Sequence, residues 1–283
     1  MINVLITGAD GQLGSELKHL ASFDCNNTFF FTDFSQLDIC NHIYVKQFII
    51  KNNINAIINC AAYTAVDRAE EQFELSNKIN NLAVKNLAII SKELNIKLIH
   101  ISTDYVFDGT NNLPYQETDK PNPQTVYGKT KLAGENAIKK INPKKTVIIR
   151  TSWVYSNYGN NFMKTMINLS KDKNEIRVIS DQVGTPTYAR DLAKTILEIL
   201  PKLNNVNTEI FHFSNEGICS WYDFAKEIFE IRNINVKLLP IKSVEYPTLA
   251  KRPYYSVLNK NKIKNKFEIE IQNWKYALKD CLK

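Results

Sequence analysis

Tyr127 and Lys131 lie four residues apart in a segment with helical periodicity, so both side chains are expected on one face of a helix. That spacing places an ammonium group close to a phenol. A free tyrosine titrates at about pH 10, and a nearby positive charge favours the phenolate and lowers its pKa toward neutrality. Such a phenol can exchange a proton with a carbonyl or alcohol oxygen. The pair predicts general acid–base chemistry, although the same spacing also occurs often by chance.

A short apolar run, residues 2–6, leads into three glycines spaced three residues apart, Gly8, Gly11 and Gly14. Glycines permit a tight turn and close approach of the backbone to a ligand, and the following helix offers unpaired N–H groups to a pyrophosphate. The spacing is a variant of the G-x-G-x-x-G fingerprint. Asp33 comes 19 residues after Gly14, where a carboxylate can bind the hydroxyls of an adenosine ribose. This segment therefore predicts a dinucleotide site.

Ser102, Thr103 and Asp104 follow directly on another apolar run, residues 98–101. Ligands of open parallel sheets bind beyond the carboxyl ends of the strands, which is where these polar side chains are expected. The chain thus presents a glycine loop, an acidic residue, a polar turn and the tyrosine–lysine pair in that order. This order favours a catalytic interpretation of the pair over a chance one.

The elements that must position these residues alternate between strand and helix over roughly the first 150 residues. Apolar runs predict strands at 2–6, 29–31, 56–60, 98–101 and 147–149, and amphipathic segments predict helices at 11–21, 41–52, 78–95 and 125–141. The strands are apolar on both faces, as expected where helices cover both sides of a sheet. We therefore expect an α/β fold with a Rossmann-like, doubly wound parallel sheet.

Beyond residue 150 the alternation is less regular, and no repeat or flexible linker separates this part from the first. Helices are expected at 160–172, 187–200 and 220–232, and strands at 176–179 and 209–213. The dinucleotide-binding domain is expected to comprise residues 1–150 with returning segments near 176–200 and 208–216. A smaller, interleaved α+β domain for the substrate would comprise residues 151–175 and 217–283.

The composition narrows the class of protein. Hydrophobic residues make up 44% and charged residues 23% of the 283, which is typical of globular domains. No apolar run approaches the roughly 18 residues of a membrane span, so no membrane partner is expected. Five cysteines without C-x-x-C spacing argue against a disulfide framework or a zinc site and favour the cytoplasm. The net charge of +7 comes from scattered residues without a basic–aromatic stripe, so no nucleic-acid partner is expected.

Several longer runs of residues resemble the extended short-chain dehydrogenase/reductase family over nearly the whole chain. These runs are residues 7–14, 59–67, 102–109, 127–135, 150–155, 159–162, 181–187 and 252–253. The first and the fourth are typical of the whole family. The T-A-V-D, S-T-D-Y-V-F and R-T-S-W-V-Y runs resemble more narrowly a group of sugar-nucleotide reductases.

The resemblance implies an enzyme that reduces the C4 keto group of dTDP-4-dehydro-L-rhamnose to give dTDP-L-rhamnose. The hydride would come from NADH or NADPH and the proton from Tyr127. Lys131 would hold the nicotinamide ribose and tune Tyr127, and Thr103 would orient the substrate oxygen. The partner is then a dTDP-4-keto-6-deoxy-L-sugar. Asp33 would repel a 2′-phosphate with no cation at Phe34 to offset it, so NADH is expected to serve at least as well as NADPH.

The resemblance also implies residues for the two ligands. Besides Tyr127 and Lys131, those for the cofactor are Gly8, Gly11, Gln12, Leu13, Gly14, Asp33, Asp38, Ile39, Ala61, Ala62, Tyr63 and Thr64. Gly11, Gln12 and Leu13 would hold the pyrophosphate, and Asp38 and Ile39 would flank the adenine. Those for the substrate are Thr103, Asp104, Trp153, Asn161 and Arg252. Trp153 would cover the sugar, and the last two would bind the diphosphate.

Some members of this family dimerise around a magnesium ion held by carboxylates, one of them in the helix after the G-x-P-T run. Glu16 matches one such ligand, but Arg190 stands in that helix. A cation there would repel the metal, so we expect no metal site and a monomer or weak homodimer. A shift of the alignment by one residue would instead place Asp191 there.

Three alternatives remain open. A sugar-nucleotide 4,6-dehydratase would share the fold and the tyrosine–lysine pair, but it carries an acidic residue where Tyr105 stands here. Another sugar-nucleotide reductase or epimerase of the family would share most of the site. A non-catalytic, NADP-binding regulatory subunit resembling the β subunit of methionine adenosyltransferase would not need the complete set of Thr103, Tyr127 and Lys131.

Overall fold

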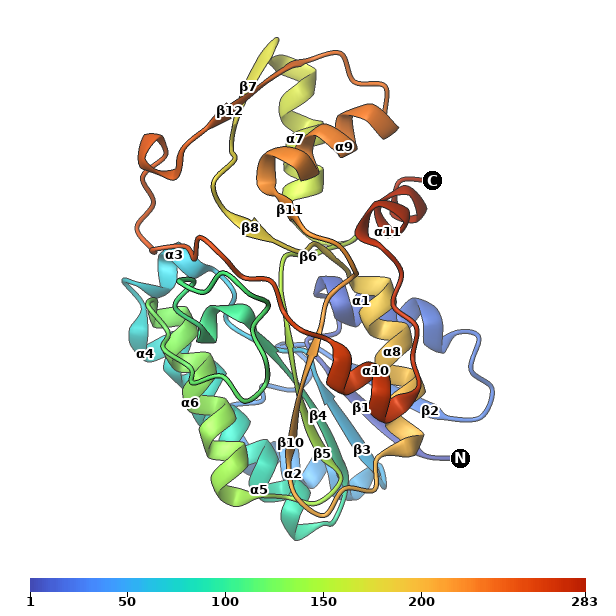
Figure 1. The fold of residues 1–283 in the computed structure, drawn as a ribbon. Coiled ribbons are helices and arrows are strands. Elements are labelled where there is room, and N and C mark those ends of the chain that lie inside the picture. Colours follow the sequence, from blue (N-terminus) through green and yellow to red (C-terminus); the bar gives the residue numbers. More distant parts are fainter.

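The computed structural model describes residues 1–283, with a central sheet flanked by helices and a smaller region beyond the carboxyl ends of its strands (Figure 1). In spatial order the strands of the sheet are β10 (Glu209–Phe213), β5 (Thr146–Thr151), β4 (Lys97–Thr103), β3 (Ala56–Asn59), β1 (Asn3–Thr7) and β2 (Thr28–Thr32). Every neighbouring pair is parallel. The predicted doubly wound parallel sheet is confirmed. We call this sheet and the helices on its two faces the sheet region.

One face of the sheet is covered by α1 (Gln12–Ala21), α8 (Ala189–Lys202) and α10 (Asn261–Phe267). Strand side chains alternate between faces, so Val4 and Ile6 point into this core while Leu5 points into the other. The core on this face joins segments far apart in sequence.

The opposite face is covered by α2 (His42–Lys51), α5 (Val84–Glu93) and α6 (Val126–Ile141). A π-helical segment, Lys78–Ala83, precedes α5, and two short helices lie beside it, α3 (Val66–Ala69) and α4 (Phe73–Asn77). Figure 1 shows α5 and α6 on the side of the sheet away from α1, α8 and α10. Both faces are thus buried, which explains the uninterrupted apolar runs of the strands.

A second apolar core defines what we call the small region. It includes α7 (Phe162–Asp172), α9 (Trp221–Ile231), α11 (Trp274–Cys281) and the parallel pair β7 (Glu175–Ile179) and β12 (Lys237–Ile241). Two further strand pairs lie between the regions, β6 (Val154–Tyr155) with β9 (Thr187–Tyr188), and β8 (Val183–Gly184) with β11 (Cys219–Ser220). Aromatic side chains are frequent in this core.

Two segments pack differently from the predicted domain division. Residues 176–179 were expected to return to the dinucleotide domain, but β7 pairs with β12, and its Ile176 and Val178 belong to the core of the small region. Conversely, α10 lies within the part expected to bind substrate, yet Ile263 and Phe267 pack into the core of the sheet region. Short amphipathic segments do not specify which of two cores they join, and this is decided by tertiary packing.

Candidate functional site

A cavity of about 830 Å³ lies at the carboxyl ends of the parallel strands, between the two regions. Most of the residues predicted for the site line it: Gly8, Gly11, Gln12, Leu13, Gly14, Asp33, Asp38, Ile39, Ala61, Ala62, Thr64, Thr103, Asp104, Tyr127, Lys131 and Trp153. The sequence order of the motifs therefore corresponds to one place in the fold. This is the position at which open α/β sheets bind ligands.

The glycine loop brings backbone close to backbone at the start of α1. Gly8 has φ +66°, and a Cβ there would meet the backbone of Ala61 at 2.7 Å. A Cβ on Gly14 would collide with the carbonyl oxygen of Gly8. The helix begins after Gly11 with no side-chain cap and no acidic residue in its first turn. Its positive end therefore faces the cavity uncompensated, which suits a pyrophosphate.

Asp33 follows β2 at the rim of this loop. Its carboxylate accepts hydrogen bonds from the backbone N–H groups of Asp10 at 2.9 Å and Phe34 at 2.7 Å, which fix its position beside the glycines. Lys78, in the π-helical segment, lines the same cavity. Lys78 is 45 residues from Asp33 in the chain, so the residues that follow Asp33 in the sequence do not identify it as a possible cation.

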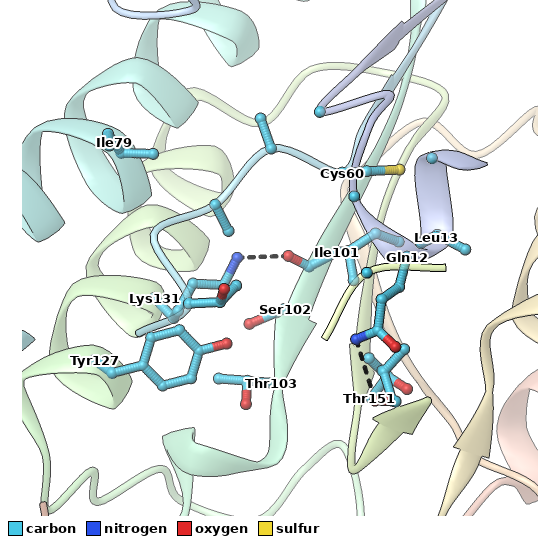
Figure 2. A pocket seen from close by; sticks show the side chains of 18 of the residues that line it. Gln12, Leu13, Cys60, Ile79, Ile101, Ser102, Thr103, Tyr127, Lys131 and Thr151 are labelled. Carbon is cyan, nitrogen blue, oxygen red and sulfur yellow. Dashed lines mark hydrogen bonds between the residues drawn. The ribbon is translucent and has the colours of Figure 1, made fainter. Parts of the chain in front are cut away.

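Tyr127, Lys131 and Thr103 meet at one side of the cavity (Figure 2). Helix α6 begins at Val126 because the side chain of Thr125 accepts the N–H of Gly128, and this cap places Tyr127 and Lys131 on its buried face. The Lys131 ammonium donates to the carbonyl of Ile101 at 2.6 Å. The hydroxyl of Tyr127 points toward Thr103.

The acid–base properties of the pair differ from the prediction. Burial raises the pKa of Tyr127 to about 12; the hydrogen bond with Thr103 opposes this rise, and the negative charge of Asp104 adds to it. The expected lowering of the Tyr127 pKa by Lys131 is wrong, because burial has the larger effect and Lys131 donates its hydrogen bond to the carbonyl of Ile101. Tyr127 is thus protonated across the physiological range, which is the form a proton donor needs.

Asp104 is a buried carboxylic acid next to Thr103. Its Oδ1 accepts a hydrogen bond from the Thr103 hydroxyl at 3.0 Å, and its Oδ2 has no partner. Burial raises the pKa of Asp104 to about 6, and hydrogen bonding with the Thr103 and Ser256 hydroxyls opposes this rise. An unpartnered buried oxygen on the cavity wall is suited to accept a hydrogen bond from a ligand hydroxyl.

Trp153 also lines the cavity and has an unusual backbone, with φ +48°. Bulky side chains rarely adopt this left-handed conformation, so tertiary contacts must hold it. Its indole stacks on Trp221 with ring centroids 3.6 Å apart and planes within 9°. A Cβ on Gly184 would meet the same indole at 2.6 Å, so a glycine is needed there. The sequence analysis selected Trp153 but missed both supports.

Three predicted site residues do not line the cavity. Tyr63 exchanges backbone hydrogen bonds with the side chain of Asn80. Asn161 caps α7 through Lys164 N–H and donates to Gln12 and to the carbonyl of Ser156, so its amide is used within the protein. Arg252 forms a two-bonded ion pair with Asp67, with contacts of 2.6 and 3.1 Å. The side chains of Asn161 and Arg252 are thus used in contacts within the protein, and their diphosphate-binding roles stay predictions.

Asn80 is a second residue that the sequence analysis missed. It is fully buried in the π-helical segment and bonds the Tyr63 backbone on one side and the hydroxyl of Thr130, next to Lys131, on the other. It thereby links the loop that follows β3 to helix α6. A π-helical insertion is a local signal of a functional site, but the sequence pattern does not reveal it.

Glu16, which matches a magnesium ligand of some family members, forms an ion pair within the protein. Glu16 is completely buried, accepts from Arg190 Nε at 2.8 Å and accepts from the Ser156 hydroxyl at 2.7 Å. Asp191 instead accepts from Asn215 and Gln272, so the one-residue shift does not bring it to Glu16. A guanidinium already bonded to Glu16 does not fit a cation site.

The chain is similar along its whole length to known sugar-nucleotide enzymes. Residues 2–283 match the family described as RmlD substrate binding domain. The dTDP-4-dehydrorhamnose reductase of Aggregatibacter actinomycetemcomitans is 42% identical over 99% of this chain and 98% of its own. The reductase of that name from Escherichia coli (strain K12) is 38% identical over 99% of this chain and 97% of its own.

Solved structures give the same result. A dTDP-4-dehydrorhamnose reductase of Clostridium acetobutylicum superposes with a TM-score of 0.94 at 46% identity, covering 99% of this chain and 98% of the other. A reductase of that name from Bacillus anthracis, solved in complex with NADP, superposes with a TM-score of 0.93 at 39% identity, with the same coverage. No helix of the structure has the length and apolarity that a membrane crossing requires.

Proposed function

The chain belongs to the RmlD substrate binding domain family, and we propose that it reduces the C4 keto group of dTDP-4-dehydro-L-rhamnose to give dTDP-L-rhamnose. One observation carries the proposal: a glycine cradle and a complete Thr103, Tyr127 and Lys131 set line the same cavity. The relatives of matching length carry the name of this activity.

Tyr127 is the proposed proton donor. The hydride to C4 would come from NADH or NADPH held in the cavity, and the keto oxygen must gain one proton as the carbonyl becomes an alcohol. Tyr127 is neutral in the cavity and can give that proton, and the Thr103 hydroxyl can donate a hydrogen bond to the same oxygen once it turns away from Asp104. The positive charge of Lys131 stabilises the phenolate left behind and is placed to hold the nicotinamide ribose.

The cofactor would lie along the glycine loop, with its pyrophosphate at Gly11, Gln12 and Leu13 and its adenosine ribose at Asp33. The uncapped start of α1 supports this placement. Gly8, Gly14, Ala61, Ala62 and Thr64 line the cavity there, and Asp38 and Ile39 would lie beside the adenine. Either nicotinamide cofactor fits this description.

The sugar would lie between Asp104 and Trp153. Asp104 offers an unpartnered carboxylate oxygen to a sugar hydroxyl, and the Trp153 ring offers a flat apolar surface to the deoxy side of the sugar. We assign cofactor binding to the sheet region. The sugar contacts we assign to Thr103, Asp104 and Tyr127 of the sheet region together with Trp153, which packs against the core of the small region. Beyond the dTDP sugar, we propose that the protein binds neither nucleic acid nor a membrane. We also propose that it is a monomer or a weak homodimer and that it acts in the cytoplasm.

The competing interpretations differ in the chemistry of this site. A dehydratase needs an acid where Tyr105 stands; here the Tyr105 ring packs on Tyr127 at 5.5 Å between centroids, and burial raises its pKa. A regulatory subunit that only binds the cofactor would have no use for the buried Thr103, Tyr127 and Lys131 together. The geometry favours an enzyme.

The test is oxidation of NADH and NADPH measured with a panel of dTDP-4-keto-6-deoxy sugars. We expect turnover with the L-lyxo sugar, dTDP-4-dehydro-L-rhamnose, and a product identified as dTDP-L-rhamnose. Cofactor binding without turnover of any sugar in the panel would favour the regulatory interpretation. Turnover of another isomer alone would reassign the substrate within the family.

A further inference from the structure

Glu135 lies on α6 one helical turn beyond Lys131, on the same buried face, and the proposed function gives it no role. We propose that Glu135 is a positioning residue that keeps the Lys131 ammonium charged and fixed against β4. The proposal rests on the proposed reduction, in which Lys131 must be a cation. The hydrogen-bonded group of Glu135, Arg150 and Ser102 would then serve catalysis as well as folding.

Glu135 is held by three hydrogen bonds from two strands. Arg150, on β5, donates from Nε at 2.9 Å and from Nη2 at 2.7 Å, and the Ser102 hydroxyl, on β4, donates at 2.5 Å. Ser102 and Arg150 are direct neighbours in the sheet register. The side chains of Glu135 and Arg150 are only 1% and 2% exposed. The carboxylate is therefore fixed in position, with both oxygens occupied.

The same two helix positions tie α6 to consecutive residues of β4. Lys131 donates to the carbonyl of Ile101, and Glu135 accepts from the side chain of Ser102, the next residue. Two bonds one helical turn apart fix the rotation and height of α6 over the sheet. Tyr127 lies one turn before Lys131 on this face, so the network also sets where its hydroxyl points.

Several other titratable groups near Lys131 are uncharged at neutral pH. Cys60, at the end of β3, is neutral because burial raises its pKa to about 12, and His100, on β4, is neutral because burial lowers its pKa. Tyr127 is neutral for the same reason as Cys60. Behind Arg150, burial lowers the pKa of His212 on β10 to about 3, so it adds no charge. Asp104 is a second buried carboxyl group on the same cavity, and Arg150 is the buried cation that pairs with Glu135. Of the carboxylates, it is Glu135 whose negative charge acts on the Lys131 pKa.

Burial and Glu135 act on Lys131 in opposite directions. Burial lowers the pKa of Lys131 to about 8, and the negative charge of Glu135 opposes this effect. A lysine with a lowered pKa is charged below that value and loses its charge as the pH rises through it. Removing Glu135 must therefore move the loss of charge, and of catalysis, to lower pH.

A buried ion pair is weak evidence for stability, since well-packed apolar residues often serve as well. Glu135 and Arg150 fill space that apolar side chains could fill at a lower desolvation cost. The ion pair therefore points to a role beyond packing. Which of its two partners lies on α6 indicates what that role is. The carboxylate, and not the guanidinium, lies on the helix of Lys131.

The experiment is an NMR titration of isotope-labelled lysine in the full chain, with the Lys131 signal identified by its loss in Lys131→Arg, together with the pH profile of kcat/KM. In Glu135→Gln we expect the Lys131 pKa and the basic limb of the profile to move to lower pH by about one unit or more. Glu135→Asp keeps the charge and should retain most of the wild-type limb. Glu93→Gln removes an exposed carboxylate that pairs with Lys46 and should leave both readouts unchanged.

Glu135→Gln leaves Arg150 buried without its partner and can fail to fold. The double variant Glu135→Gln/Arg150→Met has no unpaired buried charge and should show a smaller shift in the same direction. A folded single or double variant with the wild-type Lys131 pKa would overturn the proposal. A wild-type protein that reduces no keto sugar would overturn the proposed function instead, while the NMR titration would still decide the role of Glu135.

Discussion

The sheet region supplies most of the cavity lining, and Trp153, which packs against the core of the small region, supplies a further part. The two regions hold these side chains by different means. In the sheet region, adjacent strands end in register, with Thr7 opposite Asn59 and Thr103 opposite Thr151. Residues that follow these strands must therefore gather at one edge. Spacing along the chain is sufficient to place them.

In the small region, Trp153 is placed by contacts and not by register. Trp153 itself has a left-handed backbone. Its ring stacks on Trp221 and packs against Gly184, and these two residues belong to different segments of the chain. No repeat of spacing connects these three residues. The comparison teaches that the cofactor wall is a property of local motifs on a regular scaffold, whereas the sugar wall depends on packing.

The largest effect should come from the sheet region. In Tyr127→Phe, loss of the proton donor should lower kcat by about 100-fold or more, since general acid catalysis is worth roughly 10²–10⁴. The cofactor Kd should change little, because the ring remains. Steady-state kinetics and cofactor titration measure both, with the exposed Tyr44→Phe as control. Turnover near the wild-type rate would refute the role of Tyr127 as donor.

A change in the small region should instead affect binding of the sugar more than binding of the cofactor. In Trp221→Ala the support under Trp153 is lost, and we expect the KM for the sugar to rise by about tenfold with little change in the KM for the cofactor. Loss of the stacked pair should also remove its signal from the near-ultraviolet circular dichroism spectrum. Tyr276→Ala, at an exposed position of α11, is the control. Equal losses for both ligands would mean that the two walls are not independent.

Cofactor choice tests the sheet region more finely. We expect kcat/KM with NADH to equal or exceed that with NADPH, because the Asp33 carboxylate repels a 2′-phosphate. Asp33→Ala should improve use of NADPH several-fold, and Lys78→Met should reduce it if that lysine reaches the phosphate. Asp172→Ala, at an exposed position, is the control. A strong preference of the wild type for NADPH would show that Lys78 outweighs Asp33.

The smallest effect concerns metal at the junction of the regions. Because Arg190 already pairs with Glu16, EDTA should leave activity unchanged, and magnesium should leave the mass measured by light scattering unchanged. Arg190→Glu places a second carboxylate beside a buried one, so this variant should lose stability and recover part of it with magnesium. A magnesium-dependent dimer of the wild type would contradict the assignment of this ion pair.

The sequence by itself determined the sheet region and its half of the site. Strand runs apolar on both faces, helices between them and glycines after the first strand leave few alternatives to a doubly wound sheet. Tyr127 and Lys131 share a face because helical periodicity requires it, and Thr103 follows a strand end. These relations are local or follow from strand register, so a linear pattern contains them.

Only the tertiary structure decided the rest. Burial, which the spacing does not report, raised the pKa of Tyr127 where proximity to Lys131 predicted a fall. The pairing of Arg252 with Asp67 joins residues 185 positions apart, and that of Arg190 with Glu16 joins residues 174 apart. β7 joined the small region, and α10 joined the sheet core. Desolvation and long-range pairing depend on which surfaces meet in three dimensions, and a single sequence leaves that undetermined.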